Sequence, residues 1–98
     1  SKEMIDDTDA QDAKSEMIQK VYDYMREHLS LDAQLVFEVL VTPPPYIKER
    51  IKEGQRITNL LLVDFFELPK NRVSVKYFSE LREDIDYWEK RAAKELHF

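Results

Sequence analysis

Cysteine is absent from the 98-residue sequence, and glycine occurs only once. Without cysteine the chain forms no disulfide and no thiolate metal site, so its stability must come from packing. A chain without cysteine is typical of a reducing compartment, and we expect an intracellular, cytoplasmic protein. One glycine and four prolines leave few tight turns, whereas all-β folds need turn residues about every ten positions. The composition therefore favours helices.

Long apolar runs are also missing from the sequence. The longest, Leu60 to Val63, has four residues, against the roughly 18 that a membrane span needs. The first residues do not form the apolar segment of a signal peptide. Hydrophobic residues make up 43% of the chain and charged residues 36%, which indicates both a core and a solvated surface. We therefore expect one soluble domain without membrane association.

The net charge of −5 is unevenly distributed. Residues 1–13 hold five acidic residues and one basic residue, whereas the remainder is almost balanced. Residues 1–12 contain few apolar side chains to offset the entropy of ordering them. We therefore predict a flexible acidic N-terminal segment at 1–12 and a single helical domain at 13–98. The balanced charge of the remainder gives no overall basic field for nucleic acid.

The spacing of apolar residues predicts about four helices. Apolar side chains three and four positions apart indicate one helix over about 13–29, whose inward stripe includes Met17 and Ile18. Ser30 is typical of an N-cap for a helix over about 31–40. Three prolines at 43–45 then end that helix, and Pro45 can begin another.

The third predicted helix covers about 45–67, and the last runs from Ser79-Glu80 to about residue 96. Gly54 lies on the apolar stripe of the third helix, where we expect it to permit the close approach of a neighbouring helix. The segment 57–66 is apolar around most of its circumference, which predicts the centre of the core. Trp88 lies on the inward stripe of the last helix. Together these segments predict an all-α, compact bundle.

One segment is ambiguous. Residues 73–78 alternate apolar and polar side chains, which is a strand pattern, and residues 35–41 are rich in β-branched residues. The alternative fold class is therefore α+β, with a two-stranded pairing of 35–41 and 73–78. Such a small sheet would be marginally stable, so we favour the all-α bundle.

The sequence lacks the residues that catalysis or metal binding needs in combination. His28 and His97 are the only histidines, and neither follows a glutamate by three positions as in di-iron bundles. The five serines have no Gly-x-Ser-x-Gly setting, and a single glycine cannot form a phosphate-binding loop. We therefore expect a non-enzymatic protein, two surface histidines, no metal, no cofactor and no small-molecule substrate.

Aromatic residues are numerous for one small core. The chain has five tyrosines, five phenylalanines and one tryptophan, and such side chains are enriched at protein interfaces. Tyr22 and Tyr24 point about 160° apart on an ideal helix and so cannot share one face. The predicted partner-binding residues are Tyr22, Tyr24, Tyr46, Tyr87, Lys48 and Arg72. The opposing interpretation is that the tyrosine hydroxyls only reach the rim of the domain.

These observations predict a protein–protein interaction module that binds a protein partner or a second copy of itself. We expect its surfaces on the first and last helices, and its role as an adaptor, a regulatory domain or a small subunit. The alternative is a nucleic-acid-associated regulatory factor that uses the basic residues of the third helix and the following loop. These residues are Lys48, Arg50, Lys52, Arg56, Lys70, Arg72 and Lys76.

Overall fold

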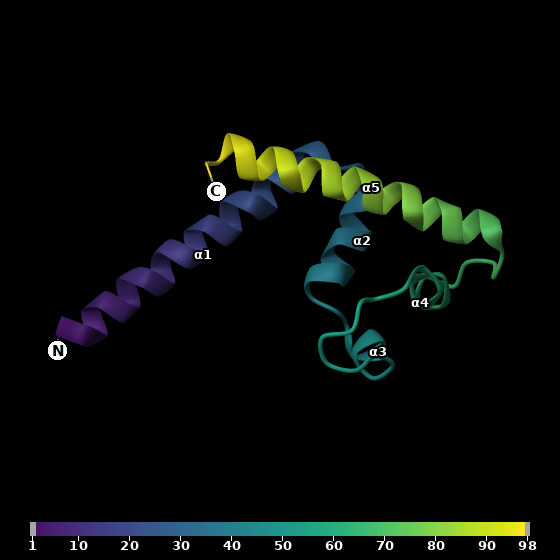
Figure 1. Cartoon of the computed structure of the whole chain (residues 1–98), viewed down its shortest axis with the longest axis horizontal. Coiled ribbons are helices and arrows are strands. Elements are labelled where there is room, and N and C mark those ends of the chain that lie inside the picture. The colour runs from purple at the N-terminus through teal and green to yellow at the C-terminus, as the bar shows by residue number, and fades with distance from the viewer. Residues whose placement is uncertain (1, 98) are drawn as a thin grey trace.

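Five α-helices form the described part of the chain, in the arrangement of Figure 1. The computed structural model describes residues 2–97, with side chains from Ala10 onward. The helices are α1 (Lys2–His28), α2 (Leu31–Val41), α3 (Pro45–Lys48), α4 (Asn59–Phe65) and α5 (Arg72–Glu95). No strand occurs between residues 2 and 97. The predicted all-α fold is therefore confirmed.

Helix α5 is the element against which three of the other four helices pack. It contacts α1, α2 and α4, while the short α3 packs against α4 (Figure 1). The chain is elongated, with extents of 56 × 31 × 18 Å. The largest fully buried side chains are Met25, Val36, Ile47, Leu62 and Val63. Because they come from α1, α2, α3 and α4, the core extends well beyond the 57–66 segment in which we expected its centre.

Three helices begin at side chains that cap them. Ser30 before α2, Thr58 before α4 and Asn71 before α5 each accept a hydrogen bond from the backbone N–H three residues later. Such caps satisfy N–H groups that have no partner within the helix. Pro45 is the first residue of α3, where its missing N–H costs nothing. The helix starts predicted at Ser30 and Pro45 are therefore confirmed.

Helix α1 is longer than predicted. It begins at Lys2, whereas the apolar spacing predicted a start near residue 13. Residues 2–12 contain no proline or glycine to interrupt a helix, and their acidic residues favour the positive end of its dipole. The flexibility of residues 1–12 and the boundary at residue 13 stay predictions, and Ser1 lies outside the described residues.

The helix predicted over 45–67 is wrong, because the chain forms α3 and α4 with a loop between them. Gly54 lies in this loop with φ +81°, a conformation that favours glycine. A Cβ atom built on Gly54 would meet nothing within 4 Å. Gly54 therefore provides a left-handed turn, and the expected close approach of a second helix is wrong. Thr58 then caps a new helix.

The α+β alternative is wrong as well. Residues 35–41 belong to α2 and residues 73–78 to α5. The alternating pattern of 73–78 has a helical explanation, because Ser74 and Phe78 are four residues apart and both buried. Asn71 caps α5, so the last helix begins at Arg72 rather than at Ser79.

Candidate functional site

An apolar groove lies between α1 and α2. It is lined by Met17, Ile18, Val21, Tyr22, Phe37 and Val41, together with Glu89 of α5, and encloses about 370 Å³. Met17, Ile18 and Val41 are each 46–47% exposed. The Tyr22 ring packs edge-on against Phe37, with ring centroids 5.7 Å apart. We call this feature the α1–α2 groove. Met17 and Ile18 therefore line a surface groove, and their expected burial is wrong.

Beyond the groove, α1 presents a long uncovered segment. Every side chain from Ala10 to Lys20 is exposed, and Figure 1 shows the N-terminal half of α1 extending away from the other helices. Only from Val21 onward do its side chains pack into the domain, where Met25 is fully buried. The groove is thus at the base of a projecting helix.

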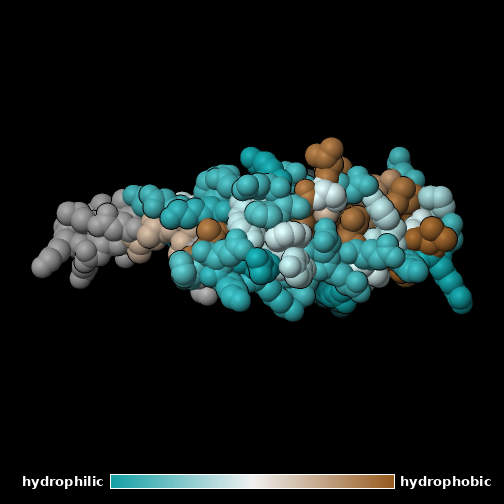
Figure 2. Space-filling view, turned by 90° about the horizontal axis from the view of Figure 1, so that it is seen from above, coloured by the Kyte–Doolittle hydropathy of each residue, from teal (hydrophilic) through white to brown (hydrophobic). Residues whose placement is uncertain are grey.

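Exposed apolar side chains also occur away from the groove. The face in Figure 2 is mostly hydrophilic, with separate hydrophobic spots that are more frequent toward the half that holds the start of α5. Val73, near that start, is 77% exposed. Single exposed apolar side chains are normal on protein surfaces. These spots therefore differ from the groove, where six apolar side chains line one hollow.

Tyr24 is buried within the domain. Its side chain is only 9% exposed and stacks on His28, with ring centroids 4.1 Å apart. Loss of solvent and then the nearby Glu95 carboxylate raise the pKa of Tyr24. The packing of α5 against α1 covers this position. The exposed position expected for Tyr24 is therefore wrong, and its contact with a partner stays a prediction.

Tyr46 and Tyr87 are exposed but lie on different helices. The Tyr46 hydroxyl donates a hydrogen bond to Asp64, which raises its pKa, and the Arg50 guanidinium lies 3.4 Å from the centre of its ring. These contacts engage Tyr46 within the domain, between α3 and α4. Tyr87 is 54% exposed and packs edge-on against Trp88, which is half-buried beside the core.

The two basic members of the predicted set are also separated. Lys48 ends α3, while Arg72 begins α5. Arg72 and Tyr87 are fifteen positions apart on α5, which corresponds to roughly 22 Å along the helix. Tyr22 alone of the six predicted partner-binding residues lines the α1–α2 groove. The structure thus distributes the predicted residues over several surfaces.

Three basic residues share a second hollow near the start of α5. Lys70, Arg72 and Lys76 line it together with Leu60, Val75 and neighbouring polar side chains. Lys70 also forms an ion pair of 3.8 Å with Asp64. The other basic residues of the nucleic-acid alternative lie on α3 and in the loop that follows, since the predicted third helix is interrupted there.

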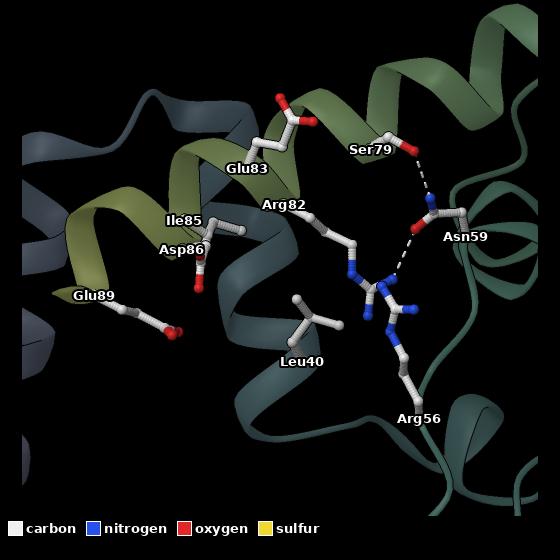
Figure 3. Close-up of a pocket in the computed structure, with 9 residues that line it drawn as sticks. All are labelled: Leu40, Arg56, Asn59, Ser79, Arg82, Glu83, Ile85, Asp86 and Glu89. Carbon is white, nitrogen blue, oxygen red and sulfur yellow. Dashed lines mark hydrogen bonds between the residues drawn. The ribbon is translucent and has the colours of Figure 1, made fainter.

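A third hollow, the arginine pocket, lies between α5, the end of α2 and the loop before α4 (Figure 3). It encloses about 470 Å³. Arg82 of α5 reaches across it, and its guanidinium donates to the Ile57 carbonyl at 2.7 Å and to Asn59 Oδ1 at 2.8 Å. Asn59 in turn donates to Ser79 Oγ at 2.9 Å. These bonds fix the loop against α5 and hold the Arg82 side chain in place.

The charges of the arginine pocket are separated. Arg56 and Arg82 are close enough that their repulsion, after the larger effect of burial, lowers the pKa of Arg82. Burial and then the neighbouring Asp86 carboxylate raise the pKa of Glu89. Figure 3 shows the two guanidinium groups near each other, while Asp86 and Glu89 lie farther along α5. The pocket has a basic end and an acidic end.

Sequence reasoning missed the arginine pocket. Arg82 lies four residues after Phe78 and three before Ile85, both of which are buried, so it shares their face of α5. A charged residue between two inward-facing positions of a helix indicates a buried polar site, and the sequence alone contains this pattern. The contribution of Arg56 and Asn59 could not be predicted, because it depends on contacts between segments that lie 20 to 25 residues apart in the sequence.

The expectation that His28 is a surface residue is wrong. Its half-buried ring lies between Tyr24 and Trp88, and Nδ1 donates to the Tyr24 carbonyl at 2.8 Å. Across the part of the chain that the structure describes, His, Asp and Glu form no group of three placed to hold a metal ion. His28 therefore acts as a packing residue at the contact of α1 with α5.

No protein-family model, no curated protein and no solved structure matches the chain. Among residues 2–97, none of the helices combines the length and the apolar character needed to cross a membrane. Inferences about function therefore depend on the three surface features described above: the α1–α2 groove, the basic hollow at the start of α5 and the arginine pocket.

Proposed function

We propose that the chain is a non-enzymatic protein–protein interaction module that self-associates through the α1–α2 groove. The observation that carries the proposal is the half-exposure of Met17, Ile18 and Val41 in one apolar hollow. Contiguous exposed apolar surface of this kind marks interaction sites. Burial of each such side chain on association contributes about 1 kcal/mol or more, in proportion to the apolar area removed from water.

The projecting part of α1 also favours a partner. Most helical stability in proteins comes from tertiary packing of an apolar face, and residues 10–20 have no buried side chain. Their association with another surface would supply the packing that the monomer lacks. Such a module is compatible with a role as an adaptor, a regulatory domain or a small subunit of an assembly. The proposal also includes an intracellular location.

The occupant we propose for the groove is the α1 helix of a second copy. One chain carries both a projecting helix and an apolar groove at its base, so a two-fold arrangement lets each copy fill the groove of the other. The same patch then serves on both sides, as a two-fold interface requires. Met17 and Ile18 are themselves helix side chains on this patch, which makes it self-complementary.

Charge favours an antiparallel pairing. Residues 1–13 have a surplus of four acidic residues, and a parallel pairing would place these segments side by side at a cost in repulsion. An antiparallel pairing centred on Met17 and Ile18 directs the two acidic segments to opposite ends of the dimer. There each would approach the base of its partner's α1, where the exposed Arg26 shares a hollow with Tyr22.

Sedimentation velocity of the full chain tests this proposal. We expect a concentration-dependent dimer for the natural sequence and a monomer for Ile18→Glu, because a carboxylate in the apolar groove would lose its hydration. Val73→Glu is the matched control, since Val73 is exposed on α5 outside the groove. A natural chain that stays monomeric at high concentration, or equal behaviour of the two variants, would contradict the proposal.

The second candidate function is nucleic-acid association through the hollow lined by Lys70, Arg72 and Lys76. Grouping of three cations beside apolar side chains supports it. Phosphate contacts give binding that falls steeply with salt concentration. Titration of an RNA or DNA oligonucleotide at two salt concentrations, with Arg72→Gln as the variant, tests this candidate. Absence of salt-sensitive binding would exclude it.

A further inference from the structure

The arginine pocket gathers charged side chains from α5 and from the loop before α4. Arg56 and Arg82 lie at the same end of it, and their mutual repulsion acts on a partly buried Arg82. Among the side chains that the structure describes, neither arginine forms an ion pair with a carboxylate. Glu83 also lines the pocket, but Figure 3 shows its carboxylate pointing away from the two guanidinium groups. Two neighbouring guanidinium groups without an ion-pair partner attract an anion, and their planar donor sets suit the oxygens of a carboxylate or a phosphate.

Arg82 is already oriented for such a ligand. Its bonds to the Ile57 carbonyl and to Asn59 use two of the five N–H donors of a guanidinium. Because the side chain is fixed by the loop, little conformational entropy is lost when a ligand binds. Arg56, in contrast, is exposed, so it can turn toward the ligand without disturbing the fold.

The other end of the pocket complements an ammonium group. Arg82 and Glu89 are seven residues apart on α5, so they project from the same face two turns and about 10 Å apart. Asp86 and Glu89 bring two carboxylates together at this end, and Asp86 is paired with Lys90 at 2.9 Å. Between the charged ends lie Leu40 and Ile85 (Figure 3), whose apolar surface suits a chain of methylene groups.

We propose that the arginine pocket binds a small zwitterion, with a carboxylate or phosphate group on Arg56 and Arg82 and an ammonium group on Asp86 and Glu89. The proposal does not require self-association, although Glu89 also lines the α1–α2 groove. The volume of about 470 Å³ is within the usual range for small-molecule sites.

Amide-resolved NMR titration of the full chain tests the proposal with three probes at constant ionic strength. 6-Aminohexanoate carries a carboxylate and an ammonium group, whereas hexanoate carries the carboxylate alone. Inorganic phosphate tests whether the basic end of the pocket also binds a phosphate group. We expect saturable shifts around Arg82 and Asn59 with all three. The added ammonium group should make 6-aminohexanoate bind about tenfold more tightly than hexanoate.

Three variants separate the two ends of the pocket. Arg56→Gln should weaken the binding of all three probes by about tenfold. Lys52→Gln, with the same charge change in the same loop, should leave their binding unchanged. Glu89→Gln should remove the preference for 6-aminohexanoate over hexanoate without weakening the binding of hexanoate. Three results would overturn the proposal: no saturable shifts in the pocket, equal behaviour of Arg56→Gln and Lys52→Gln, or a preference that survives Glu89→Gln.

Discussion

The hydroxyl of Tyr77 donates a hydrogen bond to the carboxylate of Asp32, 45 residues earlier in the chain. This bond joins α5 to the first turn of α2, and it raises the pKa of Tyr77 because the bonded Asp32 carboxylate favours the protonated phenol. Tyr77→Phe should lower the free energy of unfolding by about 1 kcal/mol, because the bond is exposed to solvent and contributes less than a buried bond to a charged group. Urea denaturation at neutral pH measures the loss, and no loss would show that the bond contributes nothing.

The raised pKa of Tyr77 also predicts a pH dependence. In the unfolded chain the phenol loses its proton near pH 10, whereas the folded chain retains it to higher pH. The unfolded state then binds fewer protons, so the free energy of unfolding falls as the pH rises through this window. Comparison of the natural chain with Tyr77→Phe between pH 9 and 11 isolates the effect. The difference in stability between them should shrink as the pH rises, and a constant difference would contradict the explanation.

Tyr24 and Tyr87 should respond in opposite ways to truncation. Tyr24→Ala removes a ring stacked on His28 and packed near Trp88, so we expect the melting temperature to fall by about 10 °C or more. Tyr87→Ala removes an exposed ring and should change the melting temperature by about 3 °C at most. Thermal melts followed by circular dichroism measure both. Equal losses would mean that the exposed Tyr87 ring stabilises the fold as much as the buried one.

Gly54→Ala distinguishes the loop from the uninterrupted helix that the sequence pattern predicted. At φ +81° an alanine is strained, and we expect a loss of about 1 kcal/mol. In a helix interior the same change would instead stabilise the chain by about 1 kcal/mol. Gly54→Asn is the control, since asparagine tolerates the left-handed region better. Stabilisation by alanine would contradict the loop.

Local signals in the sequence predicted the fold where short-range chemistry determines it. Ser30 and Pro45 marked helix starts, because capping and a missing N–H act within one turn. The break at Gly54 was hidden, since the apolar residues on either side keep a helical spacing. Tyr24 was misplaced because its burial depends on α5, some sixty residues away, and the arginine pocket likewise depends on contacts between distant segments.

The most direct test of self-association uses the absence of cysteine from the sequence. Ile18→Cys places one thiol at the centre of the proposed antiparallel pairing, so the two thiols of a dimer would lie close enough to form a disulfide. Under mild oxidation, non-reducing electrophoresis should show rapid conversion of Ile18→Cys to a covalent dimer. Val73→Cys, equally accessible on α5, should remain largely monomeric. Equal cross-linking of the two variants, or none for Ile18→Cys, would contradict the α1–α2 groove as the interface.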